Sequence, residues 1–461
     1  MEERIDPEVL KTASVLMVGV LAVFFDTTIV SVALQTLATS LHASVASIQW
    51  FTTGYLLALG VSVPLAGWAQ ARFGGKRVWL FALAVFLVGS MAASLAVGLP
   101  ALIAARAVQG VGGGLLLPLL QTLIMQQAGG AAMGRTVALI SLPIVLGPIL
   151  GPVVGGAILH WLSWHWLFWV NVPFCVAGWA LAWRYLPADR PRGRPRLDLV
   201  GLVLLGPGIV GVLLGLSNLS GSGPVVAPLL LGAALLVGFT VHALRAGERA
   251  LVDLRLLTRQ PMASTSAMLF LAGAALYGAM LLLPLYWQRV HGASALTAGL
   301  LLIPQGLGNL LSRTLAGRLT DRIGARWVSL GGVAVVGLAT VPFALVTNEW
   351  LLMAALVVRG AGLGAVMIPL MAAGFIGLKP DDMPHASILS RITQQLGGSF
   401  GTALIAVVLD RAAARMPLID AFDQAFWLTV GFTGLAVLLA LTLPTRAPSP
   451  AAEPATTSAA V

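Results

Sequence analysis

One acidic residue, Asp26, lies within an apolar stretch of the chain, at residues 12–37. The other sixteen Asp and Glu residues fall in polar stretches or at the ends of apolar runs. An ionised carboxylate inside a membrane-spanning helix costs roughly 2.5–3.5 kcal/mol even on lenient insertion scales. Protonation removes most of this cost, because an apolar environment favours the neutral acid. We therefore interpret Asp26 as a group that binds and releases a proton. The alternative is a structural aspartate bound to a neighbouring hydroxyl or arginine.

A second ionisable residue, Arg106, lies inside another apolar run at residues 100–125. A cation near Asp26 would favour the ionised carboxylate, and protonation of that carboxylate would weaken the attraction. Two groups coupled in this way form a switch with two states. The alternative is an arginine whose donors are satisfied by the carbonyl groups of neighbouring helices.

Other polar side chains within apolar runs are candidates for lining a substrate cavity. Polar groups that face lipid are costly, so most of them should face a cavity or another helix. The sequence leaves open which of the two each side chain faces. Beside Asp26, the candidates are Tyr55, Gln109, Gln121, Tyr277, Gln305, Asn309 and Gln394.

The composition is that of a membrane protein. Hydrophobic residues make up 58% of the chain and charged residues 10%, against roughly 25% charged residues in a soluble domain. Gly and Pro are abundant, as is usual where membrane helices pack closely or bend. We expect an all-α polytopic membrane protein whose first apolar run serves as an uncleaved first helix.

Fourteen apolar runs are long enough to cross a bilayer as helices. The run at residues 386–409 is the weakest of these predictions, because it contains Arg391, Thr393, Gln394 and Gln395. The runs cover residues 12–37, 45–67, 77–98, 100–125, 136–160, 165–186, 199–217, 225–244, 262–287, 296–316, 327–347, 350–375, 386–409 and 424–443.

Basic residues are distributed unevenly between the two sides of this arrangement. With a cytoplasmic N-terminus, twenty Lys and Arg residues fall in cytoplasmic loops, and three fall on the opposite side: Arg289, Arg411 and Arg415. The positive-inside rule then predicts that both termini are cytoplasmic. The net charge of +10 is therefore a signal of topology. We expect contact with membrane lipids and no nucleic-acid partner.

An internal repeat divides the chain into two similar halves. Residues 67–78 read GWAQARFGGKRV, and residues 317–328, 250 positions later, read GRLTDRIGARWV. This offset exceeds the length of six helices, so the two runs between residues 199 and 244 are an insertion between two six-helix halves. The predicted units are an N-terminal six-helix bundle (1–186), a linker with two additional helices (187–261), a C-terminal six-helix bundle (262–443) and a disordered cytoplasmic tail (444–461).

Glycine-rich motifs accompany the repeat. Both loop copies combine glycines with basic residues. The first copy contains Gly67, Arg72, Gly74, Lys76 and Arg77. The second copy, which also has one acid, contains Gly317, Asp321, Arg322, Gly324 and Arg326. A separate run contains Gly147, Gly151, Pro152, Gly155 and Gly156. Glycines four residues apart form a small-residue face that lets helices approach closely.

Together these motifs resemble the major facilitator superfamily, and within it the fourteen-helix drug:proton antiporters of the EmrB/QacA type. The resemblance covers nearly the whole chain. It rests on residues 24–34 around Asp26, residues 105–118 around Arg106, the two loop motifs and residues 146–156; residues 357–369, around Arg359, are a loose second copy of the Arg106 segment. It implies two six-helix bundles plus two extra central helices.

The resemblance also implies roles for these residues. Asp26 and Arg106 would take part in proton coupling, and the Gly-Pro-x-x-Gly-Gly element at residues 151–156 is typical of exporters. In the family, an Asp in the first loop motif helps to latch the halves together on the cytoplasmic side in the outward-open state. Ala71 occupies that position here. We therefore predict more of the inward-open state than in relatives; the alternative is that the basic residues and Asp321 suffice.

The function expected is proton-driven export of amphipathic or cationic small molecules across the bacterial inner membrane, with the proton gradient and no cofactor as energy source. Two alternatives remain: an exporter of one specific metabolite or lipid, and a non-transporting sensor or interaction protein on the same scaffold. The sequence contains no phosphate-binding Gly-x-x-x-x-Gly-Lys-Ser/Thr segment, no histidine cluster for a metal and no convergent reactive group for an enzyme. Some relatives work with a periplasmic adaptor protein, and this partner is left open here.

Overall fold

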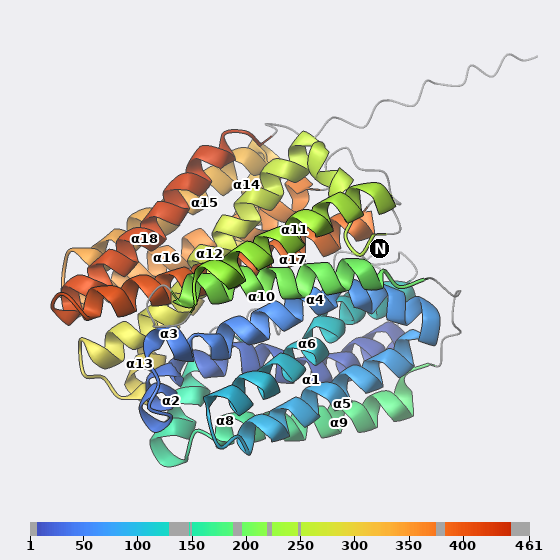
Figure 1. Cartoon of the computed structure of the whole chain (residues 1–461), viewed down its shortest axis with the longest axis horizontal. Helices are drawn as coiled ribbons and strands as arrows, with labels where there is room; N and C mark the ends of the chain where they lie inside the picture. The colour runs from blue at the N-terminus through green and yellow to red at the C-terminus, as the bar shows by residue number, and fades with distance from the viewer. Residues whose placement is uncertain are drawn as a thin grey trace, which may run out of the picture.

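Every regular element in the described part of the chain is a helix (Figure 1). The computed structural model describes residues 7–128, 147, 150–187, 196–218, 224–247, 250–374 and 383–443. Within these ranges, 13 helices are long and apolar enough to cross a membrane, and they coincide with thirteen of the fourteen predicted runs. Of the remaining run, residues 136–160, the structure describes the helix Leu150–Trp161, while residues 136–146 and 148–149 lie outside the described residues.

The helices follow one another in three groups along the chain. The first group is α1 (Pro7–Ile29), the 3-10 helix η1 (Val30–Val32), α2 (Leu34–Ser40), α3 (Val45–Ile48), α4 (Trp50–Phe73), α5 (Gly75–Ser94), α6 (Leu99–Ala128), Leu150–Trp161, α8 (Trp166–Trp169) and α9 (Asn171–Tyr185). The central group is α10 (Leu199–Ser217), α11 (Val226–Ala246) and the 3-10 helix η4 (Leu254–Thr258). The last group is α12 (Gln260–Arg289), α13 (Ala295–Leu301), α14 (Ile303–Ile323), α15 (Ala325–Thr340), η5 (Val341–Ala344), α16 (Glu349–Gly374), α17 (Met383–Ala413) and α18 (Leu418–Ala440).

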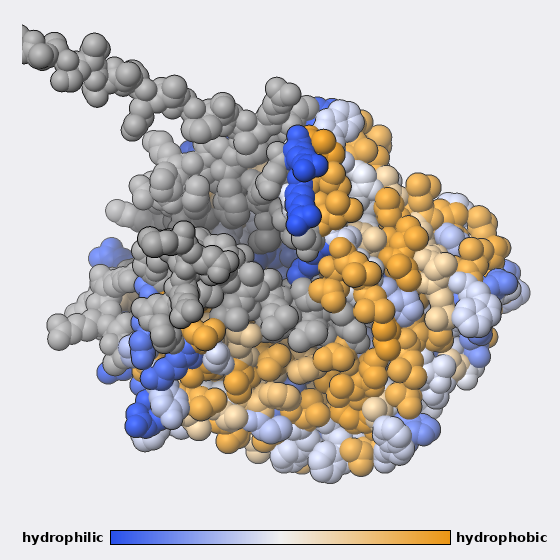
Figure 2. Space-filling view, turned by 180° about the vertical axis from the view of Figure 1, so that it is seen from behind, coloured by the Kyte–Doolittle hydropathy of each residue, from blue (hydrophilic) through white to orange (hydrophobic). Residues whose placement is uncertain are grey.

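The outer surface is apolar, as a bilayer requires. Large hydrophobic side chains such as Phe81, Leu311 and Trp350 are well exposed. Figure 2 shows hydrophobic residues over much of the described surface of one face, with hydrophilic residues toward its margins. Lipid can cover such a surface, whereas water would leave it unfavourably exposed. The chain is therefore an all-α, multi-pass membrane protein, as the sequence predicts.

Several predicted helices are interrupted, and two of the breaks have a clear local cause. The first apolar run changes from α1 to η1 at Val30, where Thr28 and Ser31 donate hydrogen bonds to backbone carbonyls one turn earlier. Such side-chain bonds compete with the helical ladder and bend helices. The run at residues 296–316 breaks at Leu302, because Pro304 in the first turn of α14 has no N–H for a continuous helix.

The internal repeat is visible in the backbone. Gly74 and Gly324, 250 residues apart, follow α4 and α14 with φ angles of 87° and 90°. Glycine adopts this conformation readily, whereas residues with a side chain rarely do. Ser44 and Ser294, also 250 residues apart, cap α3 and α13 by accepting a hydrogen bond from the third backbone N–H. The repeat therefore extends well beyond the loop motif.

The first and last groups of helices each pack mainly among themselves. In the first group, α6 packs against α4 and α5, and α1 packs against α9. In the last group, α16 packs against α14 and α15, and α12 packs against α17 and α18. We call these groups the N-half and the C-half; α4 and α17 pack against each other between them. The exact domain boundaries stay predictions, since residues 188–195 and 444–461 lie outside the described residues.

The two central helices lie against the seam between the halves. Helix α10 contacts α4 of the N-half and α17 of the C-half, and α11 packs on α10 (Figure 1). Glycines make this pairing close: a Cβ added at Gly232 would lie 2.4 Å from the backbone nitrogen of Val212, and one at Gly211 would lie 2.9 Å from Cα of Gly232. Small residues of this kind allow close helix approach in membranes.

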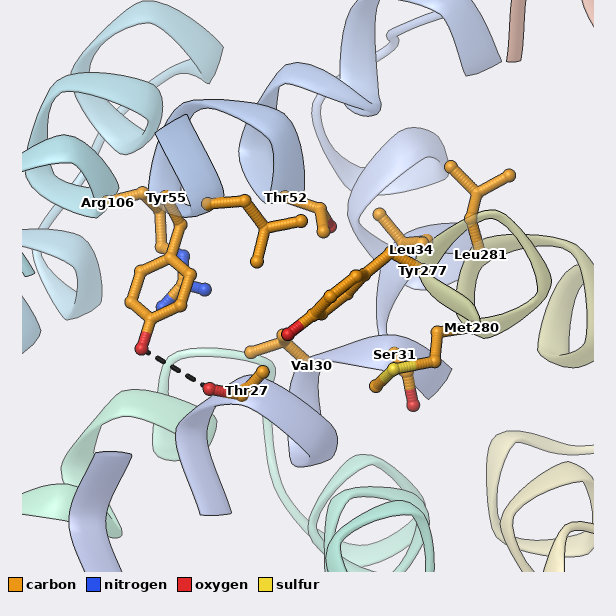
Figure 3. A pocket seen from close by; sticks show the side chains of 11 residues that line it. Thr27, Val30, Ser31, Leu34, Thr52, Tyr55, Arg106, Tyr277, Met280 and Leu281 are labelled. Carbon is orange, nitrogen blue, oxygen red and sulfur yellow. Dashed lines mark hydrogen bonds between the residues drawn. The ribbon is translucent and has the colours of Figure 1, made fainter. Parts of the chain in front are cut away.

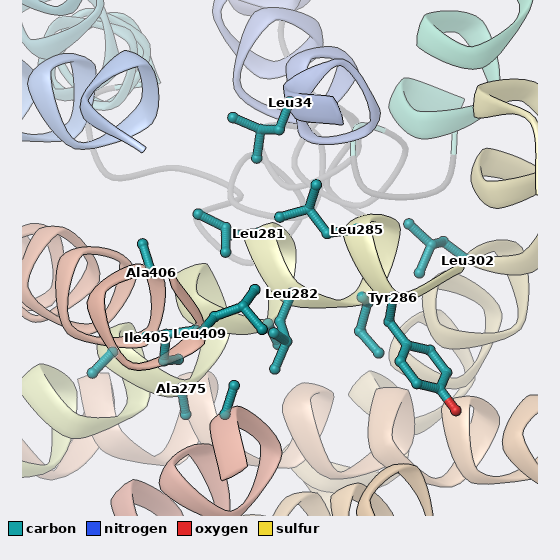
Figure 4. Close-up of a cluster of buried hydrophobic side chains, with 14 of the residues drawn as sticks. Leu34, Ala275, Leu281, Leu282, Leu285, Tyr286, Leu302, Ile405, Ala406 and Leu409 are labelled. Atoms are coloured by element: carbon teal, nitrogen blue, oxygen red, sulfur yellow. The ribbon is translucent and has the colours of Figure 1, made fainter. Parts of the chain in front are cut away.

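The halves meet at the end of the molecule that holds α2, α3 and α13, which we call the closed end. The other end, with the loops at Gly74 and Gly324, we call the motif end. At the closed end, Leu34 of the N-half lies in one buried cluster with Leu281 and Leu285 of the C-half (Figure 4). Burial of these apolar side chains stabilises the contact between the halves.

Candidate proton and substrate site

The two ionisable residues singled out in the sequence form an ion pair inside the N-half. Arg106 Nη1 lies 2.5 Å from Asp26 Oδ2, and neither side chain is exposed (0% each). A buried ion pair is tolerated when further hydrogen bonds satisfy its remaining polar atoms. The surroundings of Asp26 supply such bonds.

Three polar side chains complete the cluster around Asp26. Gln109 Nε2 donates to Asp26 Oδ1 over 3.1 Å, and Asn171 Nδ2 donates to the same oxygen over 2.9 Å. Both amides also bond to the hydroxyl oxygen of Ser90, over 2.6 Å and 2.9 Å. Gln109 in turn accepts a hydrogen bond from Arg106 Nη1 over 2.8 Å. The carboxylate is thus held by one cation and two amide donors.

Four helices bring the cluster together: α1 carries Asp26, α5 carries Ser90, α6 carries Arg106 and Gln109, and α9 carries Asn171. Glycines permit their close approach. A Cβ added at Gly89 of α5 would lie 2.6 Å from the backbone nitrogen of Gln109. A Cβ added at Gly178 of α9 would lie 2.6 Å from Cα of Gly19 in α1. The short polar contacts depend on these small residues.

Arg106 connects this cluster with the centre of the molecule. Its guanidinium carbon lies 4.1 Å from the ring centroid of Tyr55 and 4.8 Å from that of Phe51, which are cation–π distances. Tyr55 shares a hydrogen bond with Thr27 over 3.3 Å. Arg106 Nη2 has no hydrogen-bond partner among the described residues. One donor of the paired arginine therefore remains free to bond elsewhere.

A small cavity lies between the halves beside this arginine. Tyr55 of α4 and Tyr277 of α12 approach it from two sides (Figure 3). Its lining consists of Thr27, Val30, Ser31, Leu34, Thr52, Tyr55, Leu56, Arg106, Tyr277, Met280 and Leu281. Apolar side chains with a few polar groups are the usual lining of a small-molecule site.

The C-half holds a buried arginine without a carboxylate. Arg359 of α16 is 1% exposed, and it donates to Gln305 Oε1 over 2.6 Å and to Thr340 Oγ1 over 3.2 Å. Its third contact is the backbone oxygen of Ala275, at 3.5 Å. Within the described ranges, neutral oxygens alone bind this guanidinium.

The helix contacts place Arg359 at the repeat position of Gln109, not of Arg106. An added Cβ at Gly110 would lie 2.5 Å from the backbone oxygen of Tyr55, and one at Gly360 would lie 2.0 Å from that of Gln305. Both members of the second contact stand 250 residues after those of the first. Arg359 directly precedes Gly360 as Gln109 precedes Gly110. The segment around Arg359 is thus a second copy with a cation where the N-half has an amide.

The remaining cavity candidates lie apart from the cavity lining. Gln305 binds Arg359, and Asn309 lies beside the neighbouring Gly364. The backbone oxygen of Gln394 faces α12 and lies 2.2 Å from a Cβ added at Gly273. The side chain that reaches the cavity residue Tyr277 belongs to the next residue, Gln395, which donates to the Tyr277 hydroxyl over 3.4 Å. The side chain of Gln121 lies outside the described residues.

The loop-motif residues lie at the motif end, where several are exposed. Lys76 Nζ donates to the backbone oxygen of Leu186 over 2.7 Å, at the C-terminus of α9. A cation is favourable there, because carbonyl groups at a helix C-terminus lack partners. The exposed basic members are Arg72, Arg77 and Arg322, and Arg326 lies over the ring of Trp327. Nothing lies within 4 Å of a Cβ added at Gly67 or Gly317. The side chain of Asp321 lies outside the described residues.

The glycines of residues 147–156 make close contacts in two directions. At Gly151, an added Cβ would lie 1.9 Å from Thr28 Oγ1, and at Gly155 it would lie 2.4 Å from the backbone oxygen of Ile29, so both glycines face α1. Gly147 faces Phe24 of the same helix more loosely, at 3.5 Å. Gly156 instead faces the C-half, 2.6 Å from the backbone of Ala295. In return, a Cβ at Gly299 would lie 2.2 Å from the backbone oxygen of Pro152.

The sequence analysis missed two members of the Asp26 cluster. Asn171 and Ser90 are polar residues inside or at the end of apolar runs, which is the same signal that identified Gln109. No group of three His, Cys, Asp or Glu side chains in the described ranges is placed to hold a metal ion. The arrangement can bind and release a proton at Asp26, with Arg106 responding to the change of charge.

Comparison with known proteins identifies the family. The profile of the Major Facilitator Superfamily matches residues 16–402 and 265–460. A protein of Mycobacterium tuberculosis (strain ATCC 25618 / H37Rv) named multidrug resistance protein B homolog is 36% identical over 417 residues, covering 88% of this chain and 77% of that protein. The lincomycin resistance protein LmrB of Bacillus subtilis (strain 168) is 30% identical over 409 residues, covering 86% and 84% of the two chains.

Solved structures share the fold at low sequence identity. A bacterial homologue of the human lysosomal transporter Spinster, in an inward-facing and unoccupied conformation, aligns with a TM-score of 0.68 and 17% identity over 97% of this chain and 100% of its own. A D-xylose–proton symporter aligns with a TM-score of 0.68 and 15% identity over 95% and 98% of the two chains. The chain is a membrane transporter of the Major Facilitator Superfamily and is similar in sequence to proteins named for drug resistance.

Proposed function

We propose that this transporter exports amphipathic small molecules from the bacterial cytoplasm in exchange for protons that bind at Asp26. The observation that carries the proposal is the buried Asp26–Arg106 pair, whose arginine also lines the cavity between the halves. Relatives named for multidrug and lincomycin resistance support the exporter role. The density of basic residues at the motif end supports a cytoplasmic position for that end and for both termini.

Protonation changes the balance of charge in the cluster. A neutral Asp26 attracts Arg106 less, because protonation removes the Coulomb attraction between the two opposite charges. Arg106 then gains freedom to bond in the cavity, where Tyr55 already contacts its face. Proton and substrate thereby compete for the same arginine, and each stabilises a different conformation of the transporter.

The conformation observed fits one step of such a cycle. The halves are in contact at the closed end, through Leu34 and Leu281 among others. An inward-facing state with the motif end in the cytoplasm would keep this end closed. Substrate would enter from the cytoplasm, and protons would enter from the outside after the halves have rocked about the central cavity.

Dye transport into inverted membrane vesicles tests the proposal. An acidic vesicle interior should drive uptake of at least one of two xanthene dyes, the cation rhodamine 123 or the anion fluorescein. An uncoupler and the Asp26→Asn variant should each abolish this uptake. The matched control is Asp423→Asn, which removes a carboxylate from α18 outside the cluster and should leave uptake intact.

A folding defect must be separated from a coupling defect. Size-exclusion chromatography in detergent checks that Asp26→Asn is monodisperse, and Asp26→Glu, which keeps the carboxyl group, should retain part of the transport. Unchanged gradient-driven uptake in Asp26→Asn would contradict the proposal, as would a wild type that moves neither dye.

A further inference from the structure

Positive charge inside the C-half is not balanced as it is in the N-half. The spanning helices of the C-half contain Arg313, Arg359 and Arg391, and none of these forms an ion pair with a described carboxylate. In the N-half, the buried arginine Arg106 is instead paired with Asp26. Arg359 is 1% exposed, whereas Arg313 and Arg391 are half-buried. A cation withdrawn from water without a counter-ion is costly, which favours an anionic partner that is bound during function.

One face of α17 gathers unpartnered polar atoms close to the cavity. Arg391, Gln395 and Ser399 follow one another at intervals of four residues and therefore share a helix face. Arg391 Nε, Gln395 Oε1 and Ser399 Oγ are all buried and lack a hydrogen-bond partner among the described residues. Gln395 is 8% exposed and Ser399 is 0% exposed.

Tyr277 connects this face with the cavity. Gln395 Nε2 donates to the Tyr277 hydroxyl over 3.4 Å. The ring packs where α17 has no side chain: a Cβ added at Gly398 would lie 2.5 Å from Tyr277 Cδ2. Tyr277 lines the cavity (Figure 3), so the same side chain contacts both the cavity and the polar face of α17.

We propose that Arg391, with Tyr277 as a further donor, binds an anionic group of the transported compound. The substrate class is then an amphipathic organic acid, whose apolar part contacts the lining at Val30, Met280 and Leu281. Carboxylates and sulfonates fit this donor set, because a guanidinium presents paired N–H groups to planar oxyanions. This class differs from the cations expected from the sequence. The inference rests on the proposed exporter function and specifies its substrate.

The two xanthene dyes test the charge preference with similar ring systems. Gradient-driven uptake should favour fluorescein over rhodamine 123. Arg391→Gln should raise the KM for fluorescein about tenfold or more, since a hydrogen bond between charged groups is lost. Arg391→Lys should restore part of the affinity. Arg318→Gln, which removes an equal charge from an exposed site at the motif end, should leave the KM unchanged.

A binding measurement separates this inference from the exporter function. Purified protein in phosphatidylcholine nanodiscs should bind fluorescein, and Arg391→Gln should weaken that binding by the same factor. Binding that is equal in wild type and Arg391→Gln, or transport of rhodamine 123 alone, would overturn the anion subsite while the exporter function stands. Displacement of fluorescein by added phosphatidylglycerol would assign the site to a lipid and overturn the substrate class. Fluorescein binding without any transport would count against the exporter function alone.

Discussion

Arg289 of α12 donates a hydrogen bond from Nε to the side-chain oxygen of Gln35 in α2, which joins the two halves at the closed end. Gln288 adds a bond to the backbone oxygen of Val32 over 3.0 Å. The apolar cluster at the same end contains Val32 together with Leu34 and Leu281, and Figure 4 shows Leu34 and Leu281 on opposite halves. The closed end is thus sealed by an apolar layer with a polar bond beside it.

Breaking the Gln35–Arg289 bond should open this end more often. Gln35→Ala removes the acceptor, and the loss of one hydrogen bond to a charged group shifts the equilibrium by roughly 1.5–3 kcal/mol. A cysteine placed at Leu281 in a Cys175→Ala background should then react faster with a membrane-impermeant maleimide. A cysteine at the exposed Thr39 controls for general reactivity; unchanged labelling at position 281 would show that the bond does not hold the closed end.

Restoring the missing acid of the first loop motif should open the closed end by a different route, through the motif end. Ala71→Asp supplies the carboxylate that the second copy has at Asp321, and it should favour contact between the halves at the motif end. Labelling at Leu281→Cys should rise as the closed end opens. Ala71→Asn, which matches Asp in size without its charge, should leave the labelling rate at that of the parent.

The Asp26–Arg106 pair should show strong coupling in stability. Asp26→Asn leaves a buried guanidinium without its counter-ion, and loss of one partner of such a pair costs roughly 3–5 kcal/mol. Adding Arg106→Gln removes the orphaned charge and should recover much of that loss. Thermal unfolding in detergent of both single variants and the double variant gives the coupling; additive effects would mean that the pair is not energetically linked.

Close helix contacts predict which glycines tolerate a methyl group. At Gly155, a Cβ would lie 2.4 Å from the backbone oxygen of Ile29, so Gly155→Ala must push α1 away and should destabilise by about 1–3 kcal/mol. At Gly67, nothing lies within 4 Å of the added Cβ, so Gly67→Ala should be neutral or slightly stabilising. Equal melting temperatures for the two variants would contradict the packing described here.

Asp198, just before α10, should make stability depend on pH in the acid range. Burial alone would raise its pKa, but the N–H groups of Gly201 and Leu251 and the His242 ring bond to the carboxylate and hold its pKa below the ordinary value. A lowered pKa in the folded state stabilises the fold above about pH 3.9, and this contribution is lost as pH falls through the lowered pKa.

The Asp198→Asn variant measures this contribution. Its melting temperature should lie below that of the wild type at neutral pH, and the difference should shrink below about pH 4. Asp253→Asn, a change at the half-buried N-cap of η4 in the same linker, controls for loss of charge. A difference that does not change with pH would show that ionisation of Asp198 is not what stabilises the linker.

The spans were predictable because hydrophobic length alone specifies a membrane helix. The breaks at Val30 and Leu302 were not, since they depend on single hydroxyl and proline positions whose effect is local. In the site, polarity inside an apolar run identified Asp26, Arg106 and Gln109 together. It could not choose Gln395 over Gln394, because neighbouring residues on a helix point about 100° apart and only the packing of α17 decides which one meets Tyr277.

The position of α10 has a mechanical consequence. Because α10 contacts both α4 and α17, no rocking of the halves can leave all its contacts unchanged. It must travel with one half and slide along the other, and its glycine-lined fit to α11 means that the pair moves as one piece. The inserted helices must therefore exchange contacts beside the central cavity during each transport cycle. The strength of their contacts with each half contributes to the energy barrier of that cycle.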